Sequence, residues 1–262
     1  YLYTNGSRFT AYTEFGIPGI SPREVLEGII PAEELFPPRP GTAWEEHHAF
    51  GAWDGDPSTW LGLPTLARYF PPAETLDELI AQSSLLQGEG YKAVFEEARR
   101  QKPYCSMALN WCFDEPWPAA ANNSLVAYPA VLKPAIAEVR RACRPLCASA
   151  RFARFDWKEG ETFEAEVWIL NDVFARTGPF VVTVTLRAGR AEERILRWES
   201  PSVEPNRNTA GPTARFRLPA WDTDRFGVEL SVEGHPEMNA CYTLMYRRSP
   251  RKRRCTSMNV TE

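Results

Sequence analysis

Hydrophobic and polar positions follow different patterns in the two parts of this chain. In the second part they alternate: Phe163, Val167 and Ile169 are separated by Glu164 and Glu166. Alternation with a period of two is typical of a β-strand that buries one face. The pattern therefore predicts a strand whose apolar side chains face a core and whose carboxylates face water.

Similar short apolar runs recur through the second part, separated by turn residues such as Lys158-Glu159-Gly160 and Ala188-Gly189. We expect strands at 148–155, 162–169, 180–187, 193–198, 214–218, 227–233 and 241–246. Many short strands with turns between them are typical of two packed antiparallel sheets. The sequence thus predicts an immunoglobulin-like β-sandwich over 145–248, followed by a basic tail at 249–262.

Residues 1–144 mix strands and helices. The expected order is a strand at 9–15, a helix at 21–30, an irregular segment at 36–72, a helix from 75 to about 101, a strand at 105–113 and a helix at 135–142. This order is typical of the end of a β/α barrel, but a complete barrel needs roughly 250 residues. The expected fold class is α/β plus all-β: an incomplete C-terminal portion of a (β/α)8 TIM barrel, then the sandwich.

Two helix starts can be located from capping residues. Ser21 precedes Pro22 and stands three residues before Glu24, and Thr75 stands three residues before Glu78. A hydroxyl at the N-cap followed by a glutamate three positions later is the capping-box pattern. The sequence therefore predicts that Ser21 and Thr75 cap their helices.

The apolar run 107–113 ends abruptly in Asp114 and Glu115. A strand of a parallel sheet reads as continuously apolar when both of its faces are covered. In a β/α barrel, polar and aromatic groups appear where such strands end, because the sites lie at their carboxyl ends. We therefore expect 9–15 and 105–113 to be parallel strands with Glu14 and Trp111 at the same end.

Composition narrows the possible partners. The chain of 262 residues has 44% hydrophobic and 24% charged residues and a net charge of -4. These values indicate an ordinary globular protein and give no reason to expect nucleic acid or a membrane as partner. The basic cluster at 251–254 is interpreted as a solvated tail. Aromatic residues make up 12% of the chain, and Trp can stack on the apolar face of a sugar ring.

Six cysteines lie scattered along the chain, and none forms a Cys-x-x-Cys pair. Because no histidine pair stands at metal-ligand spacing beside them, we expect neither a metal nor a cofactor. The chain begins at Tyr1 without a signal-peptide pattern, so we expect it to be the trailing part of a longer polypeptide. Its location is open, with a periplasmic or secreted bacterial enzyme as the leading expectation.

Two motifs carry a resemblance to a known family. Residues 111–118, Trp-Cys-Phe-Asp-Glu-Pro-Trp-Pro, resemble the Trp-Gln-x-Asn-Asp-x-Trp-Pro signature of the β-mannosidase and exo-β-glucosaminidase branch of glycoside hydrolase family 2. Residues 12–16, Tyr-Thr-Glu-Phe-Gly, resemble the Ser-Glu-Phe-Gly motif around that family's nucleophile. The resemblance implies a retaining exo-β-glycosidase that acts on terminal β-linked sugars, mannosides or related ones.

The resemblance also implies roles for single residues. A retaining glycosidase uses one carboxylate as nucleophile and a second carboxyl group as acid and base. Glu14 matches the nucleophile, and Trp111 matches the apolar wall of the sugar subsite. The acid/base of the family lies in an Asn-Glu pair, which this chain does not contain. Either the missing N-terminal part of the polypeptide supplies it, or the protein is not catalytic; Asp114 and Glu115 are the local alternative.

Further side chains are expected at the substrate. They are Tyr12, His47, His48, Trp53, Asp114, Glu115 and Trp117. For the histidines a solvated loop position is the alternative, and for Trp117 a structural rim. Cys112, Asp114 and Glu115 replace the family's Gln, Asn and Asp, so the sugar stays open. Glu97 with Arg99 and Arg100 matches a family pair that is expected to hold its helix against the barrel.

Two other function classes remain possible from the sequence. The first is a non-catalytic carbohydrate-binding or structural protein that keeps the barrel shell. The second is a protein-interaction module formed by the sandwich. The enzyme interpretation is preferred, with a carbohydrate as substrate and the missing N-terminal segment as partner; on its own this chain is expected to be inactive.

Overall fold

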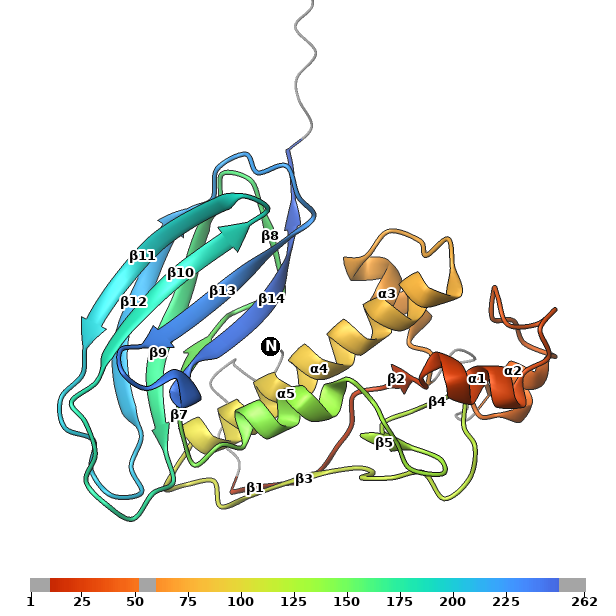
Figure 1. The fold of residues 1–262 in the computed structure, drawn as a ribbon, viewed down its shortest axis with the longest axis horizontal. Helices are drawn as coiled ribbons and strands as arrows, with labels where there is room; N and C mark the ends of the chain where they lie inside the picture. Colours follow the sequence, from red (N-terminus) through yellow and green to blue (C-terminus); the bar gives the residue numbers. More distant parts are fainter. Residues whose placement is uncertain (1–9, 52–59, 250–262) are drawn as a thin grey trace, which may run out of the picture.

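The computed structural model describes residues 10–51 and 60–249. A β-sandwich occupies one end of an elongated molecule, and short helices and loops occupy the other (Figure 1). The long helix α4, Leu76–Arg100, runs between them, with α5, Ala135–Ala142, packed along it. No helix in this described part is long and apolar enough to span a membrane.

The sandwich consists of two sheets. One has the strand order β11-β10-β13-β14-β8, and the other β12-β9-β7. The bounds are β7 Leu146–Arg151, β8 Asp156–Lys158, β9 Thr162–Asn171, β10 Val181–Ala188, β11 Ala191–Glu199, β12 Thr209–Arg217, β13 Arg225–Val232 and β14 Ala240–Arg247. The pairs are antiparallel except that β8 runs parallel to β14. A two-sheet sandwich was predicted from the alternating runs and is confirmed.

The register of β9 follows the alternation in its sequence. Phe163, Val167 and Ile169 are fully buried, whereas Glu164 is exposed and Glu166 half-buried. A shift by one residue would exchange the two faces of the strand. The predicted inward set is therefore confirmed.

The run 148–155 is one predicted strand but two segments in the structure. β7 ends at Arg151 in the three-stranded sheet, and β8 begins at Asp156 in the five-stranded sheet. The chain crosses between the sheets at 152–155, where Phe152 and Phe155 are both buried. Because the crossing lies inside the core, its apolar residues resemble a continuous strand.

The first part contains the parallel pair β1, Ala11–Phe15, and β3, Met107–Asn110. The predicted parallel pairing is confirmed. The remaining elements are β2 Gly19–Ile20, α1 Arg23–Ile29, α2 Ala43–Glu46, α3 Leu63–Tyr69, β4 Ala121–Asn122, β5 Val126–Ala127, β6 Val131–Leu132 and a 3-10 helix at Pro236–Met238. Two short helices therefore interrupt the segment 36–72, which was expected to be irregular throughout.

One face of the β1–β3 pair packs on α4, and the other is open. Tyr12 and Phe15 of β1 are buried together with Tyr91 and Val94 of α4. On β3 every described side chain is exposed or half-buried. The expectation that both faces of this run are covered is wrong for the described residues, because no third layer lies against the pair. Only the α4 side supplies a core.

One of the two predicted helix caps forms. Thr75 Oγ1 accepts a hydrogen bond from Glu78 N at 3.2 Å, which caps α4. α1 instead begins at Arg23 with Pro22 at the N-cap and no side-chain cap. The Ser21 hydroxyl donates to Ala119 O at 2.7 Å, so it ties the helix start to a distant loop. Tertiary contact overrides the local capping pattern there.

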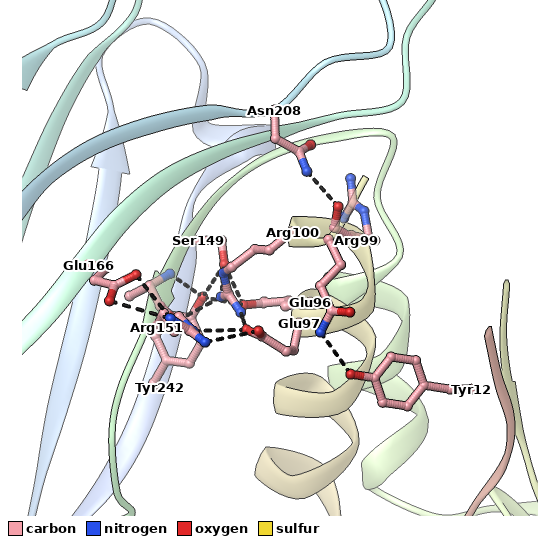
Figure 2. A network of polar contacts seen from close by, with 12 residues as sticks. Tyr12, Glu96, Glu97, Arg99, Arg100, Ser149, Arg151, Glu166, Asn208 and Tyr242 are labelled. Carbon is pink, nitrogen blue, oxygen red and sulfur yellow. Dashed lines mark hydrogen bonds and ion pairs between the residues drawn. The ribbon is translucent and has the colours of Figure 1, made fainter. Parts of the chain in front are cut away.

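A buried polar network joins α4 to the sandwich (Figure 2). The Arg151 guanidinium on β7 binds both Glu97 carboxylate oxygens at 3.1 Å. Arg100 contacts Glu96 at 3.0 Å and Glu97 at 3.1 Å, and Tyr242 of β14 donates to Glu96 at 2.8 Å. Glu97 and Arg100 therefore hold the helix against the sandwich, not against the barrel strands as was expected.

A second ionic cluster lies nearer the N-terminal end of α4, between that helix, α5 and β14. Lys92 is 2% exposed and contacts Glu89 at 3.2 Å, Glu138 of α5 at 2.5 Å and Cys241 O at 2.7 Å. Thr243 N donates to Glu89 at 2.9 Å. Burial raises the pKa of the Glu89 carboxyl from its ordinary value of 4.5 to about 7, and Lys92 opposes this shift.

This raised pKa predicts that stability falls as the pH rises. Between pH 4.5 and about 7 the unfolded chain loses the Glu89 proton while the folded chain keeps it. The folded state then binds more protons, so the free energy of unfolding decreases through this window. The full effect corresponds to roughly 3 kcal/mol. We expect Glu89→Gln to remove most of this slope.

Urea unfolding of the wild-type chain and of Glu89→Gln, at intervals from pH 4.5 to 8, measures how the free energy of unfolding depends on pH. Glu164→Gln, on an exposed face of the sandwich, is the control and should keep the wild-type slope. Parallel profiles for the chain and Glu89→Gln would contradict the assignment.

Candidate functional site

The carboxyl ends of β1 and β3 bring Glu14 and Trp111 to the same end of the parallel pair. Phe15 is paired with Asn110, and Trp111 N donates to Phe15 O at 2.8 Å. Glu14 and Trp111 are both exposed, and the Trp111 side chain is 51% accessible. The site therefore begins as an open edge on which a carboxylate and an indole stand at the same end of two neighbouring strands.

An irregularity in β1 determines which side chains it presents. Tyr12 is paired with Ala108 but Phe15 with Asn110, so β1 has one residue more than β3 between these pairs. Thr13 and Glu14 occupy this bulge and are both exposed. A bulge places two consecutive side chains where a regular strand would alternate, and such bulges occur beside active sites. The bulge frees the Glu14 carboxylate from the α4 side of the sheet.

α4 fixes the loops that follow both strands. Gln87 Nε2 donates to Ile17 O at 3.0 Å and to Ser124 O at 3.2 Å, which links the loop after Glu14 to the loop after Trp111. A Cβ at Gly16 would lie 2.2 Å from the Asn123 side chain, so only glycine permits this close approach. The two motifs are therefore held against each other by buried polar contacts.

His47 and His48 lie against the Trp117 loop. His47 Nδ1 is 2.9 Å from Pro118 O. The His48 ring stacks on Trp60 with centroids 5.6 Å apart and meets Trp117 edge-on at 6.1 Å. Burial lowers the pKa of His48, so this imidazole is neutral at neutral pH. Trp117 is 47% exposed and stands on this aromatic base.

Glu115 lies beneath the loop in a buried ion pair. Lys133 Nζ is 2.9 Å from Glu115 Oε1, and both side chains are fully buried. The Ser124 hydroxyl donates to the same carboxylate, and Lys133 donates to Gly19 O and Asn122 O at 3.2 Å. Burial lowers the pKa of Lys133 despite this partner. Direct contact with a substrate, which was expected for Glu115, does not suit a carboxylate so enclosed.

Two other expected contacts lie in the core or outside the described residues. Tyr12 is 7% exposed, and its hydroxyl accepts a hydrogen bond from Gln101 Nε2 at 2.9 Å on the α4 side. It supports the strand and does not stand beside Glu14. Trp53 lies outside the described residues. Trp44 of the same irregular segment is fully buried, with its Nε1 donating to Glu34 O at 2.9 Å.

The structure therefore divides the expected residues into groups. Glu14 and Trp111 share one strand end, and Asp114 is exposed on the segment after Trp111. His47, His48 and Trp117 form a second group on the adjoining loops. Lys133 was not predicted from the sequence to be the partner of Glu115. A lysine between an apolar pair and a proline gave no signal of burial, because its partner is 18 positions away in the chain.

Among the described residues, no group of His, Cys, Asp or Glu side chains could hold a metal ion. The described side chains at the strand end are the carboxylates of Glu14 and Asp114 and the indole of Trp111.

Comparison with known proteins gives a likeness of fold. No family model matches the sequence, and no curated protein matches it either. A β-D-mannosidase from Dictyoglomus thermophilum is similar over 93% of this chain, with a TM-score of 0.67 and 20% identity. An exo-chitosanase from Amycolatopsis orientalis, solved with PNP-β-D-glucosamine, is similar over 92%, with a TM-score of 0.66 and 14% identity. The chain spans 28% of the length of each. The fold is thus similar to that of a segment of the β-D-mannosidase and of the exo-chitosanase.

Proposed function

We propose that this chain is a segment of a retaining exo-β-glycosidase of glycoside hydrolase family 2, made up of the C-terminal part of the catalytic barrel and the β-sandwich that follows it. Residues 1–144 would form the C-terminal portion of a TIM barrel whose other strands and helices come from further polypeptide. Residues 145–248 would form the immunoglobulin-like sandwich that follows the barrel. The observation that carries this proposal is the exposed Glu14 in a strand bulge beside Trp111, in a chain folded like part of a β-mannosidase.

The open face of β3 supports the barrel interpretation. Met107, Leu109, Trp111 and Phe113 follow one another at every second position and are 42%, 51%, 51% and 60% exposed. A contiguous exposed apolar surface of this kind usually marks contact with another protein segment. Further barrel strands would cover the β3 part of this face, leave Trp111 open at its carboxyl end, and pair with the outer edges of β1 and β3.

In the proposed mechanism, the Glu14 carboxylate attacks the anomeric carbon while a second carboxyl group gives its proton to the leaving oxygen. The same group then removes a proton from water, and the water oxygen displaces Glu14 from the sugar. Trp111 would form the apolar wall behind the sugar ring. Trp117, which packs against the His48 ring, would line the rim of the site. The second carboxyl group belongs to the absent strands, since this chain has no Asn-Glu pair.

The chain on its own is therefore expected to release no aryl alcohol from β-mannoside, β-glucosaminide, β-galactoside or β-glucuronide substrates. A polypeptide that supplies the remaining strands should cleave at least one of them. A chromogenic assay of both proteins over this panel measures the difference and also identifies the sugar.

Turnover by the chain alone would contradict the assignment of the second carboxyl group to the further strands. Asp114 is the exposed carboxylate that would then act as the acid, and Asp114→Asn should abolish that turnover. Binding of the sugar by the completed barrel without cleavage of any substrate would instead favour the non-catalytic carbohydrate-binding protein.

A further inference from the structure

A pocket of about 270 Å³ lies where the C-terminal end of α4 meets the sandwich. Its lining includes Trp168 of β9, Arg151 of β7, and Pro103 and Tyr104 of the turn that leads into β3. The turn lies at the opposite end of β3 from Trp111. The pocket is therefore separate from the candidate site.

Aromatic side chains form the walls of this pocket. Trp168 is paired with Ser149 and lies on the same face of its sheet as Arg151. Its side chain is half-buried, so part of the ring stays open. Tyr104 is 52% exposed. The indole, the phenol and the proline ring offer apolar faces to the pocket.

Three residues of the polar network in Figure 2, Glu97, Arg100 and Arg151, also line the pocket. Arg151 is fixed by two contacts of 3.1 Å to Glu97 and lies 3.5 Å from Glu166. Lys102, also in the lining, is paired with Asp172. Arg100, the third cation of the lining, contacts Glu96 and Glu97, so each cation of the lining has a carboxylate partner. The pocket offers rigid hydrogen-bonding groups without an excess of charge, which disfavours an anionic ligand.

We propose that this pocket binds one ring of a neutral saccharide. The apolar face of the sugar would stack on Trp168, and its hydroxyl groups would reach Arg151 and Glu97. Small-molecule sites combine apolar and aromatic walls with a few fixed polar groups, and this volume is below the range for drug-sized ligands. A single sugar ring suits it. The inference does not depend on the chemistry of Glu14, because such a site would serve an enzyme and a binding protein equally.

Fluorine NMR of the chain labelled with 5-fluorotryptophan tests the proposal. The probes are mannotriose, cellotriose and triacetylchitotriose at millimolar concentrations, and the Trp168 signal is assigned from Trp168→Phe. At least one trisaccharide should shift this signal saturably. Calorimetric affinity for that sugar should fall about tenfold or more in Trp168→Ala and in Tyr104→Ala.

Phe174→Ala is the matched control, because it removes an exposed aromatic ring that lines neither the pocket nor the candidate site and should leave this affinity unchanged. Urea midpoints of the variants establish that each is folded. Absence of saturable binding by all three sugars overturns the proposal. Binding that survives Trp168→Ala and disappears in Trp117→Ala also overturns it, since the sugar then occupies the candidate site. Neither outcome tests the proposed role of Glu14 as nucleophile.

Discussion

Glu14→Gln is expected to lower turnover of an aryl β-glycoside by about four orders of magnitude in the polypeptide that completes the barrel. In the proposed mechanism the Glu14 carboxylate forms the bond to the anomeric carbon, whereas an amide of the same shape cannot do so at a useful rate. Because Glu14 is exposed in a strand bulge, the substitution leaves no buried partner unsatisfied and should not alter the fold. Sugar affinity should remain close to that of the wild type, and kcat with inhibitor binding measures both quantities.

The control is Glu164→Gln, which removes another exposed carboxylate on the far sandwich and should leave kcat unchanged. Azide gives a sharper readout in Glu14→Ala. It attacks the anomeric carbon in place of the lost carboxylate, expels the aryl alcohol, and should yield a glycosyl azide of inverted configuration. Undiminished turnover in Glu14→Gln, or an azide product of retained configuration, would remove Glu14 from the nucleophile role.

The elements predicted correctly from the sequence are those whose signal is local. The Thr75–Glu78 capping pair and the alternation around Val167 depend on residues a few positions apart, and both correspond to the structure. The parallel pairing of β1 and β3 followed from two apolar runs that end in acids. Their order in the chain is a sequence property, even though their contact is not.

The features that the sequence did not reveal depend on distant contacts. The bulge at Glu14 exists because β1 has one residue more than its partner strand, which no single segment shows. Ser21 has the residue type of a cap but bonds to Ala119 instead. Arg100 was assigned to the barrel from the family resemblance, whereas its contacts to Ser149 and Ala150 join segments about fifty positions apart.

For the candidate site, the sequence indicated which residue types are present but not which of these side chains are buried. A Trp, a Tyr and a Glu near a strand end are all equally expected, from sequence alone, to face a substrate. Trp111 is half exposed, whereas Tyr12 and Glu115 are buried. The difference arises from which face of β1 packs on α4 and from the lysine that approaches Glu115 from the far side of its loop. Neither can be deduced from the periodicity of an interrupted segment.

That lysine gives the largest expected effect on stability. Lys133→Met leaves the Glu115 carboxylate buried, with the Ser124 hydroxyl and the Tyr128 N–H as its remaining hydrogen-bond donors among the described residues. Removal of one member of a buried ion pair typically costs about 3–5 kcal/mol, because the remaining charge is neither solvated nor paired. We expect a loss of this size in the free energy of unfolding, measured by urea titration of the chain at neutral pH.

The second substitution separates the pair from the packing around it. In Lys133→Met/Glu115→Leu no charge remains, and apolar side chains of similar volume fill the space, so most of the lost stability should return. The double-mutant cycle then gives a coupling energy of a few kcal/mol. Arg215→Met breaks the exposed 2.7 Å pair with Glu164 and should cost less than about 1 kcal/mol. If Lys133→Met costs no more than Arg215→Met, the pair does not hold the Trp117 loop, and its burial stabilises nothing.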